Sequence, residues 1–307
     1  MKRVVVIALA LIAVGAVAQE QTAQPQTPKD LRFSTNLTQR DEAPSYSDLY
    51  CAGFMTTEAV SKTNAITGGT RSPEETLFYR GTQVFVGGGG LQEGSEYSVV
   101  RELKDPNHYE PFKGARAAQA AAGQPYAELG RIKVVATRGT EAVAEVEFSC
   151  QNMTLGDIVI PFHEHAPVTY RKSGTMERFP SAPGHLNARI VMGQEFDAEA
   201  GQGRKVYINA GSNKGVKVGD YFRAVRGYDP EKLNESDSLS YKGPVGEDTQ
   251  KVPGSVTAET AKQLPLRNLG EMIVLNVTPS SSTAMITNSL EDIMVGDYVE
   301  LEENPAQ

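Results

Sequence analysis

Residues 269–302 read LGEMIVLNVTPSSSTAMITNSLEDIMVGDYVELE, and residues 129–162 read LGRIKVVATRGTEAVAEVEFSCQNMTLGDIVIPF. The two stretches align without a gap at an offset of 140 residues, and eight of the 34 aligned positions are identical. Both begin with Leu-Gly, and both carry Gly-Asp before a final apolar run. Repetition at a fixed offset indicates a duplicated structural unit.

Within each copy the local pattern is that of β-strands. Residues 272–277 and 283–287 are β-rich runs on either side of a Pro-Ser turn cluster, and residues 143–148 alternate apolar and acidic side chains. Such patterns predict hairpins with one face in water. Five or six short strands per copy favour an all-β fold, with each repeat a small closed barrel or a two-layer sandwich.

A looser match extends each copy upstream. Residues 206–226 parallel residues 84–101, and a candidate strand precedes each block, at residues 50–55 and 186–192. The predicted repeats therefore span residues 48–162 and 186–303, joined by a Pro-rich linker at residues 163–185 and followed by a short tail at residues 304–307.

The N-terminus predicts export. Lys2 and Arg3 precede an apolar stretch that ends in Ala16-Val17-Ala18, which is typical of a signal peptide spanning residues 1–18. The alternative, a signal anchor, is too short to cross a bilayer. The polar Gln-, Thr- and Pro-rich residues 19–47 predict a flexible tether. We expect a periplasmic or secreted protein with no transmembrane helix in the mature chain.

Composition excludes several classes of protein. The 307 residues have a net charge of −8, two Cys and no Trp. Removal of Lys2 and Arg3 leaves 28 basic against 38 acidic residues, a net charge of −10. Because the basic residues are scattered and outnumbered, nucleic acid is not an expected partner. Two Cys are too few for a disulfide-rich scaffold.

Two segments depart from the β pattern. Residues 113–122 are Ala-rich and predict a short helix that ends at Gly123. At the same place in the second copy, residues 229–262 form a longer polar stretch. We interpret it as a solvated loop, although a role specific to the second copy stays open.

The Gly-Asp pair occurs three times, at Gly156-Asp157, Gly219-Asp220 and Gly296-Asp297. Aspartates at matching positions could be metal ligands or catalytic acids. A structural role is favoured: Gly supplies a positive φ for a tight turn, and the Asp carboxylate accepts backbone N–H bonds at the next strand.

Cys51 and Cys150 are the two cysteines, and a disulfide between them is favoured in an exported chain. We place both in the first copy, so that this copy alone is cross-linked. The alternative is a pair of buried thiols.

The sequence His163-Glu164-His165 is a possible metal-ligand cluster, because two His separated by one residue share a face of a strand. A solvated linker is the favoured interpretation, so no metal site is predicted. His108 and His185 are isolated and are assigned no role.

Signatures of common catalytic sites are missing from the sequence, including a Gly-x-Ser-x-Gly elbow, a Walker loop and His-Glu-x-x-His. We therefore predict a protein that is not an enzyme and uses no cofactor. Its predicted role is an interaction or assembly module, with envelope proteins or cell-wall glycan as partners. The alternatives are a carbohydrate- or peptidoglycan-binding protein and, less favoured, a secreted hydrolase.

Residues 206–226, VYINAGSNKGVKVGDYFRAVR, followed by residues 269–301, resemble the C-terminal domain of flagellar assembly protein T. They are also similar to β-domains repeated in bacterial envelope proteins that carry LysM modules. The shared pattern is a strand, Gly-Val-x-x-Gly-Asp, a strand ending in Arg, and a distal Gly-Asp. The resemblance implies a small β fold that acts in the envelope or in assembly, without catalytic residues.

Overall fold

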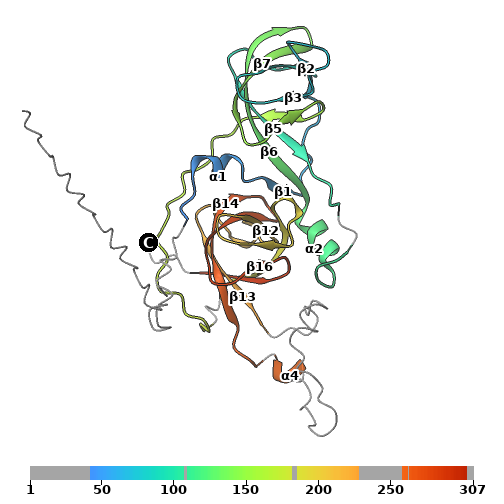
Figure 1. Ribbon diagram of the computed structural model, residues 1–307. Helices are drawn as coiled ribbons and strands as arrows, with labels where there is room; N and C mark the ends of the chain where they lie inside the picture. The colour runs from blue at the N-terminus through green and yellow to red at the C-terminus, as the bar shows by residue number, and fades with distance from the viewer. Residues whose placement is uncertain (1–41, 107–108, 182–184, 228–257, 262, 303–307) are drawn as a thin grey trace, which may run out of the picture. The chain divides into compact units, whose positions relative to one another are not determined.

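The computed structural model describes residues 42–106, 109–181, 185–227, 258–261 and 263–302. Its regular secondary structure is mostly β-strand, and the strands close into two six-stranded barrels (Figure 1). The predicted all-β fold with two tandem repeats is confirmed, and of the two alternatives it is the barrel that forms.

The first barrel closes when β7 pairs with β6, in the order β6-β5-β9-β2-β4-β7. Its strands are β2 (Ala65–Gly69), β4 (Gln83–Gly87), β5 (Glu96–Glu102), β6 (Gln124–Arg138), β7 (Glu141–Ser149) and β9 (Ile158–Pro161). Two short strands, β3 (Leu77–Phe78) and β8 (Met153–Thr154), pair with each other in a separate two-stranded sheet. Closure leaves the six strands without a free sheet edge.

The second barrel repeats this topology as β10-β12-β15-β14-β13-β17. Its strands are β10 (Asn187–Gly193), β12 (Lys205–Ile208), β13 (Tyr221–Arg226), β14 (Arg267–Val277), β15 (Ser282–Ser289) and β17 (Tyr298–Leu301). The matching short pair is β11 (Glu199–Ala200) with β16 (Ile293–Met294). Two 3₁₀ turns, η2 (Gln194–Phe196) and η3 (Ser212–Lys214), complete it.

Even the irregularities of the two barrels coincide. The β6–β7 ladder shifts register between Val134 and Ala136, and the β14–β15 ladder shifts between Val274 and Asn276. These bulges lie 140 residues apart, as the sequence repeat does. Because a bulge re-aims the side chains that follow it, equivalent residues of the two barrels face the same way.

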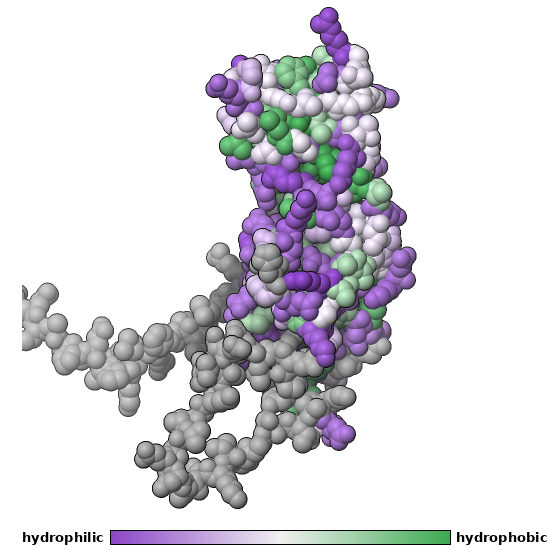
Figure 2. All heavy atoms as spheres, turned by 90° about the vertical axis from the view of Figure 1, so that its right-hand side faces the viewer, coloured by the Kyte–Doolittle hydropathy of each residue, from purple (hydrophilic) through white to green (hydrophobic). Residues whose placement is uncertain are grey.

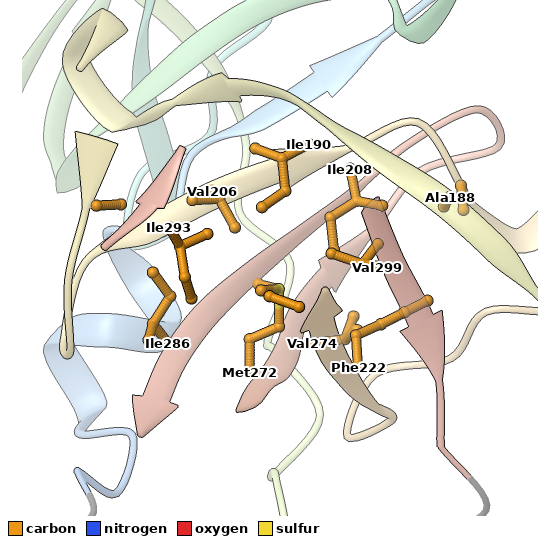
Figure 3. Packing of buried hydrophobic residues seen from close by; sticks show 14 of the residues in the cluster. Ala188, Ile190, Val206, Ile208, Phe222, Met272, Val274, Ile286, Ile293 and Val299 are labelled. Atoms are coloured by element: carbon orange, nitrogen blue, oxygen red, sulfur yellow. The ribbon is translucent and has the colours of Figure 1, made fainter. Parts of the chain in front are cut away.

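Each barrel has its own apolar core. In the second barrel, inward side chains from all six strands meet at the centre (Figure 3). The labelled members of that core are Ala188, Ile190, Val206, Ile208, Phe222, Met272, Val274, Ile286, Ile293 and Val299. Burial of such side chains contributes about 1.5–3 kcal/mol each relative to exposure, which makes these cores the main source of stability.

Three further elements lie outside the barrels. Helix α1 spans Tyr46–Tyr50, strand β1 spans Phe54–Thr56, and helix α2 spans Ala115–Ala122. Helix α2 is the predicted Ala-rich helix, and it ends at Gly123 as expected. Helix α4 spans Ala258–Ala261 and is the described part of the predicted loop at residues 229–262.

The predicted opening strand of the first copy is corrected by the structure. Residues 50–55 do not match residues 186–192, because the counterpart of β10 is β2. Instead α1 ends at Tyr50, and β1 pairs with the start of β6 outside the barrel. Residues 50–55 have the pattern of a half-buried strand. Any extended segment that packs on one side has the same pattern, so it does not distinguish a barrel strand from a segment outside the barrel.

Several predictions fall outside the described residues. These are the signal peptide at residues 1–18, the tether up to residue 41, most of the loop at residues 229–262, and the tail. Residues 42–47 of the predicted tether are described, and its end is corrected, because Tyr46 and Ser47 belong to α1. None of the helices in the described ranges has the length and hydropathy of a membrane span.

Candidate functional site

The segment at residues 45–56, here called the strap, contains α1 and β1 and packs on the outside of the second barrel (Figure 1). Ser45 begins α1 through a capping box with Asp48. The Asp48 carboxylate also accepts a charged hydrogen bond of 2.9 Å from Lys205 Nζ on β12. These contacts hold the first half of the strap.

The second half of the strap crosses four strands of the second barrel along one outward-facing row. This second-barrel row consists of Leu275 on β14, Thr283 on β15, Tyr207 on β12 and Met192 on β10. Ala52 belongs to the same buried apolar cluster as Leu275, and Met55 belongs to the same cluster as Tyr207 and Met192. All four row residues are buried, although they point away from the barrel core.

Side-chain hydroxyls bind the carbonyl groups of the strap. Thr283 Oγ1 donates to the Gly53 carbonyl at 2.8 Å. Thr278 Oγ1 and Ser281 Oγ donate to the Met55 carbonyl at 2.7 and 2.8 Å. A buried carbonyl without a partner costs about 1–3 kcal/mol, so these bonds specify where the extended segment lies.

Gly53 is required at the closest point of this contact. Its φ is +67°, and a Cβ at this position would lie 2.5 Å from Tyr207 Oη. The Tyr207 hydroxyl donates to the Ala52 carbonyl at 3.4 Å. Burial raises the pKa of Tyr207, so the phenol stays neutral and remains a donor.

The disulfide between Cys51 and Cys150 is confirmed, but it does not staple the first barrel to itself. Cys150 follows β7 of the first barrel, whereas Cys51 lies in the strap. Gly53 N also donates to Glu128 Oε2 on β6 at 2.9 Å. The strap is therefore bonded to both barrels.

The linker packs on another part of the second barrel. Arg171 stacks on the Tyr221 ring at 4.2 Å, and it pairs with Glu271 at 3.0 Å and with Glu302. Its backbone N–H donates to Tyr221 Oη at 2.7 Å. Burial raises the pKa of Glu271, although the charge of Arg171 opposes this effect.

The Gly-Asp pairs form tight turns. Gly156, Gly219 and Gly296 have φ values of +84°, +88° and +97°. Asp157, Asp220 and Asp297 accept backbone N–H bonds from Thr154, Lys217 and Met294, at 2.6, 2.8 and 2.7 Å. The donor thus lies three residues upstream of each Asp, before the Gly, and not in the next strand.

Sequence reasoning missed the Arg partners of two of these aspartates. Arg101 at the end of β5 binds both carboxylate oxygens of Asp157, and Arg226 at the end of β13 does the same to Asp297. The signal was present, since both matched strands end in Arg. The pairing itself depends on β5–β9 and β13–β17 neighbours, which the sequence does not reveal.

His163, Glu164 and His165 lie along an open groove of about 630 Å³ that also contains Val60 and Val218. His165 Nε2 is 3.6 Å from Glu128 Oε1, and its ring meets Tyr50 edge-on. In the described ranges, no three His, Cys, Asp or Glu side chains gather as metal ligands would. His108 lies outside those ranges.

No known protein-family model matches the chain, and no match was found among curated proteins.

Proposed function

We propose that the chain is an exported, non-catalytic interaction or assembly module of the cell envelope, which binds polypeptide on the outer faces of its barrels. One observation carries the proposal. The second barrel already holds an extended segment, the strap, along the second-barrel row, whose four residues lie on four strands. An apolar row beside hydroxyls that bind carbonyl groups has the chemistry of peptide recognition.

The envelope part of the proposal is supported by the N-terminal export pattern and by the resemblance of residues 206–226 and 269–301 to envelope and flagellar assembly β-domains. The disulfide agrees with an oxidising compartment.

The position of the exposed aromatic rings favours a protein partner over a glycan. A sugar-binding face uses neighbouring rings as platforms, yet the exposed aromatic side chains of the described residues lie on separate segments. These are Tyr46, Tyr79, Phe85, Tyr109, Phe179 and Tyr298. Tyr298 lies under Arg189 and Tyr46 packs on Tyr50, so each of these two rings already has a partner within the chain.

Affinity isolation tests the proposal. The tagged full chain is expressed in its native host, crosslinked in intact cells and isolated from the envelope fraction, with an uncrosslinked sample as the control. We expect a defined envelope protein to be covalently recovered. Recovery of glycan without protein would overturn the proposal in favour of carbohydrate binding.

A further inference from the structure

The first connector, residues 103–114 between β5 and α2, packs on the second barrel through Phe112, which is 6% exposed. The guanidinium carbon of Arg189 lies 3.8 Å from the centre of the Phe112 ring and 4.9 Å from that of Tyr298. The Phe112 ring also lies so close to Gly296 that an added Cβ there would be 2.5 Å from Phe112 Cδ1. Arg189, Gly296 and Tyr298, here called the second seat, thus hold an aromatic side chain of the connector.

The first barrel has the equivalent positions. Strand pairing matches Ala65 with Arg189 and Ile158 with Tyr298, because the two pairs form at the same place in each barrel. The 140-residue offset matches Gly156 with Gly296. We call Ala65, Gly156 and Ile158 the first seat. Gly296 is buried under Phe112, whereas Gly156 is exposed and an added Cβ there would meet nothing within 4 Å.

The first seat lines an open hollow of about 530 Å³. Leu155 at its edge is 46% exposed, whereas Val295, its counterpart in the second barrel, is half-buried. In the part of the chain that the structure describes, no side chain lies over Gly156 as Phe112 lies over Gly296. Figure 2 shows apolar and hydrophilic side chains next to one another on the surface of the first barrel, in the upper part of the view. The duplicated seat is therefore filled in one barrel and open in the other.

The charges around this hollow are basic in balance. Five charged residues line it: Lys62, Arg101, Lys104, Glu102 and Asp157. Glu102 pairs with Lys62, and Asp157 pairs with Arg101. Lys104 is exposed and forms no ion pair with another described residue. The next residue, Asp105, lines a separate cavity together with Arg116. One positive charge is thus left over, which favours an acidic occupant.

The sequences of the two connectors indicate which acidic segment fits. The first connector has Tyr109-Glu110-Pro111 directly before Phe112, and the second connector, residues 227–257 between β13 and α4, has Tyr228-Asp229-Pro230 directly before Glu231. Tyr, an acidic residue and Pro follow one another nowhere else in the 307 residues. Glu231 thus stands where Phe112 does, and residues 229–237 contain four acidic residues and one basic residue. Residues 228–257 lie outside the described ranges, so this correspondence is one of sequence.

We propose that the first seat binds the second connector of another copy of this chain, with Glu231 in the hollow and its carboxylate toward Lys104. The inference rests on the proposed polypeptide-binding function and names a partner for it. The first connector binds the barrel that follows it, so a second connector bound in the same way needs a barrel one step further along. The first barrel of the same chain lies one step back, and the contact therefore joins two copies head to tail. Such a heterologous contact generates a ring or a filament, not a two-fold dimer.

Crosslinking between two differently tagged mature chains tests the proposal. One copy carries a photo-crosslinking residue in place of Leu155, and the other copy is wild type. We expect a crosslink between the two tagged chains, which mass spectrometry maps to residues 228–237 of the wild-type copy. The matched control places the photo-crosslinking residue at Val135, which is 45% exposed but does not line the hollow, and it should not label this segment.

Charge reversal identifies the contact. Lys104→Glu in the copy with the crosslinker, or Glu231→Lys in the other copy, should each lower the crosslink yield at least about threefold, because an attraction becomes a repulsion. The two changes together should restore the yield, which would not happen if either variant failed to fold. Lys172→Glu, at an exposed Lys outside the hollow, should leave the yield unchanged.

Four results would overturn the proposal: no crosslink between the two chains up to about 1 mM protein, a crosslink confined to residues 228–237 of the same copy, equal labelling from position 135, or no restoration by the paired charge reversals. The proposed function is read separately, from the envelope crosslinking. Glycan alone in that experiment overturns the function, whereas an envelope protein recovered without self-association overturns only the head-to-tail contact.

Discussion

The guanidinium of Arg226 binds both carboxylate oxygens of Asp297, at 2.9 Å through Nε and at 2.7 Å through a terminal nitrogen. Arg101 and Asp157 form the same fork in the first barrel, at 2.8 and 2.7 Å. The pair in the second barrel is the more buried, because the Arg226 side chain is 18% exposed and that of Arg101 is 34% exposed. The duplicated unit thus carries a duplicated ion pair, differing in burial.

Replacement of Asp297 by Ala should destabilise the protein by about 3–5 kcal/mol, because it leaves a buried guanidinium without its partner. Asp157→Ala is the matched control and should cost less, since water reaches Arg101 more easily. Urea unfolding followed by circular dichroism measures both. Equal losses for the two variants would contradict the burial argument.

Replacement of Gly53 by Ala should loosen the strap. Gly53 and Gly139 have nearly the same φ, +67° and +66°, but an added Cβ meets Tyr207 Oη at 2.5 Å at position 53 and open space at position 139. Gly139→Ala should therefore cost only the backbone strain, about 1 kcal/mol, and Gly53→Ala clearly more. Protease sensitivity near Tyr50, together with thermal unfolding, distinguishes release of the strap from general destabilisation.

The first barrel has Val143 at the position equivalent to Thr283. Replacement of Thr283 by Val therefore introduces this residue type under the strap. The Gly53 carbonyl then loses its 2.8 Å donor while buried, which should cost about 1–3 kcal/mol. The reverse change, Val143→Thr, alters a half-buried side chain on the outer face of the first barrel and should be close to neutral. Guanidinium unfolding of both variants tests the prediction, and a neutral Thr283→Val would show that the hydroxyl does not hold the strap.

Acid should weaken the hold of Lys205 on the strap. Burial acts to raise the pKa of Asp48, but hydrogen bonds from Ser45 and Lys205 outweigh it, so the pKa lies below the ordinary 3.8. The carboxylate therefore contributes stability above pH 3.8, and that contribution is lost as the pH falls through the folded-state pKa.

Asp48→Asn provides the measurement. The difference in unfolding free energy between wild type and Asp48→Asn should be constant near neutral pH and shrink below about pH 4. A difference that stays the same down to pH 2.5 would contradict the assignment to the Asp48 carboxylate.

Removal of the disulfide by Cys51→Ala with Cys150→Ala should lower stability by up to about 4–5 kcal/mol, the chain-entropy value for a loop of 99 residues. The docked strap should survive, because β1 still pairs with β6 and its carbonyl bonds remain. Hydrogen exchange of residues 52–56 is the measurement, with the oxidised wild type as the control. Full loss of protection there would mean that the disulfide alone holds the strap.

The repeat explains why so much of the fold could be predicted. An ungapped offset of 140 residues constrains both hairpins at once, and it placed β6, β7, β14 and β15 correctly. The Ala-rich helix was recognisable because its propensity and its Gly stop agree with each other. In these elements the local sequence pattern favours the same secondary structure that the tertiary fold requires.

The position of the strap could not be predicted, because the second-barrel residues on which it packs are far from it in the sequence. Ala52 to Met55 have the pattern of a strand, but nothing local says whether that strand enters a barrel or lies across one. The disulfide pairing followed from counting cysteines, whereas its role depended on where Cys51 lies. The Arg–Asp forks likewise require the strand order.

The bond from Thr283 to the Gly53 carbonyl joins residues 230 positions apart. During synthesis the strap emerges early, but the β15 strand that receives it comes near the end of the chain. Contacts of such long sequence separation form slowly, because loop closure must precede any gain. The outer surface of the second barrel is thus completed by a segment that is synthesised before any of its strands, and the loss of β15 would expose residues that precede it by 230 positions.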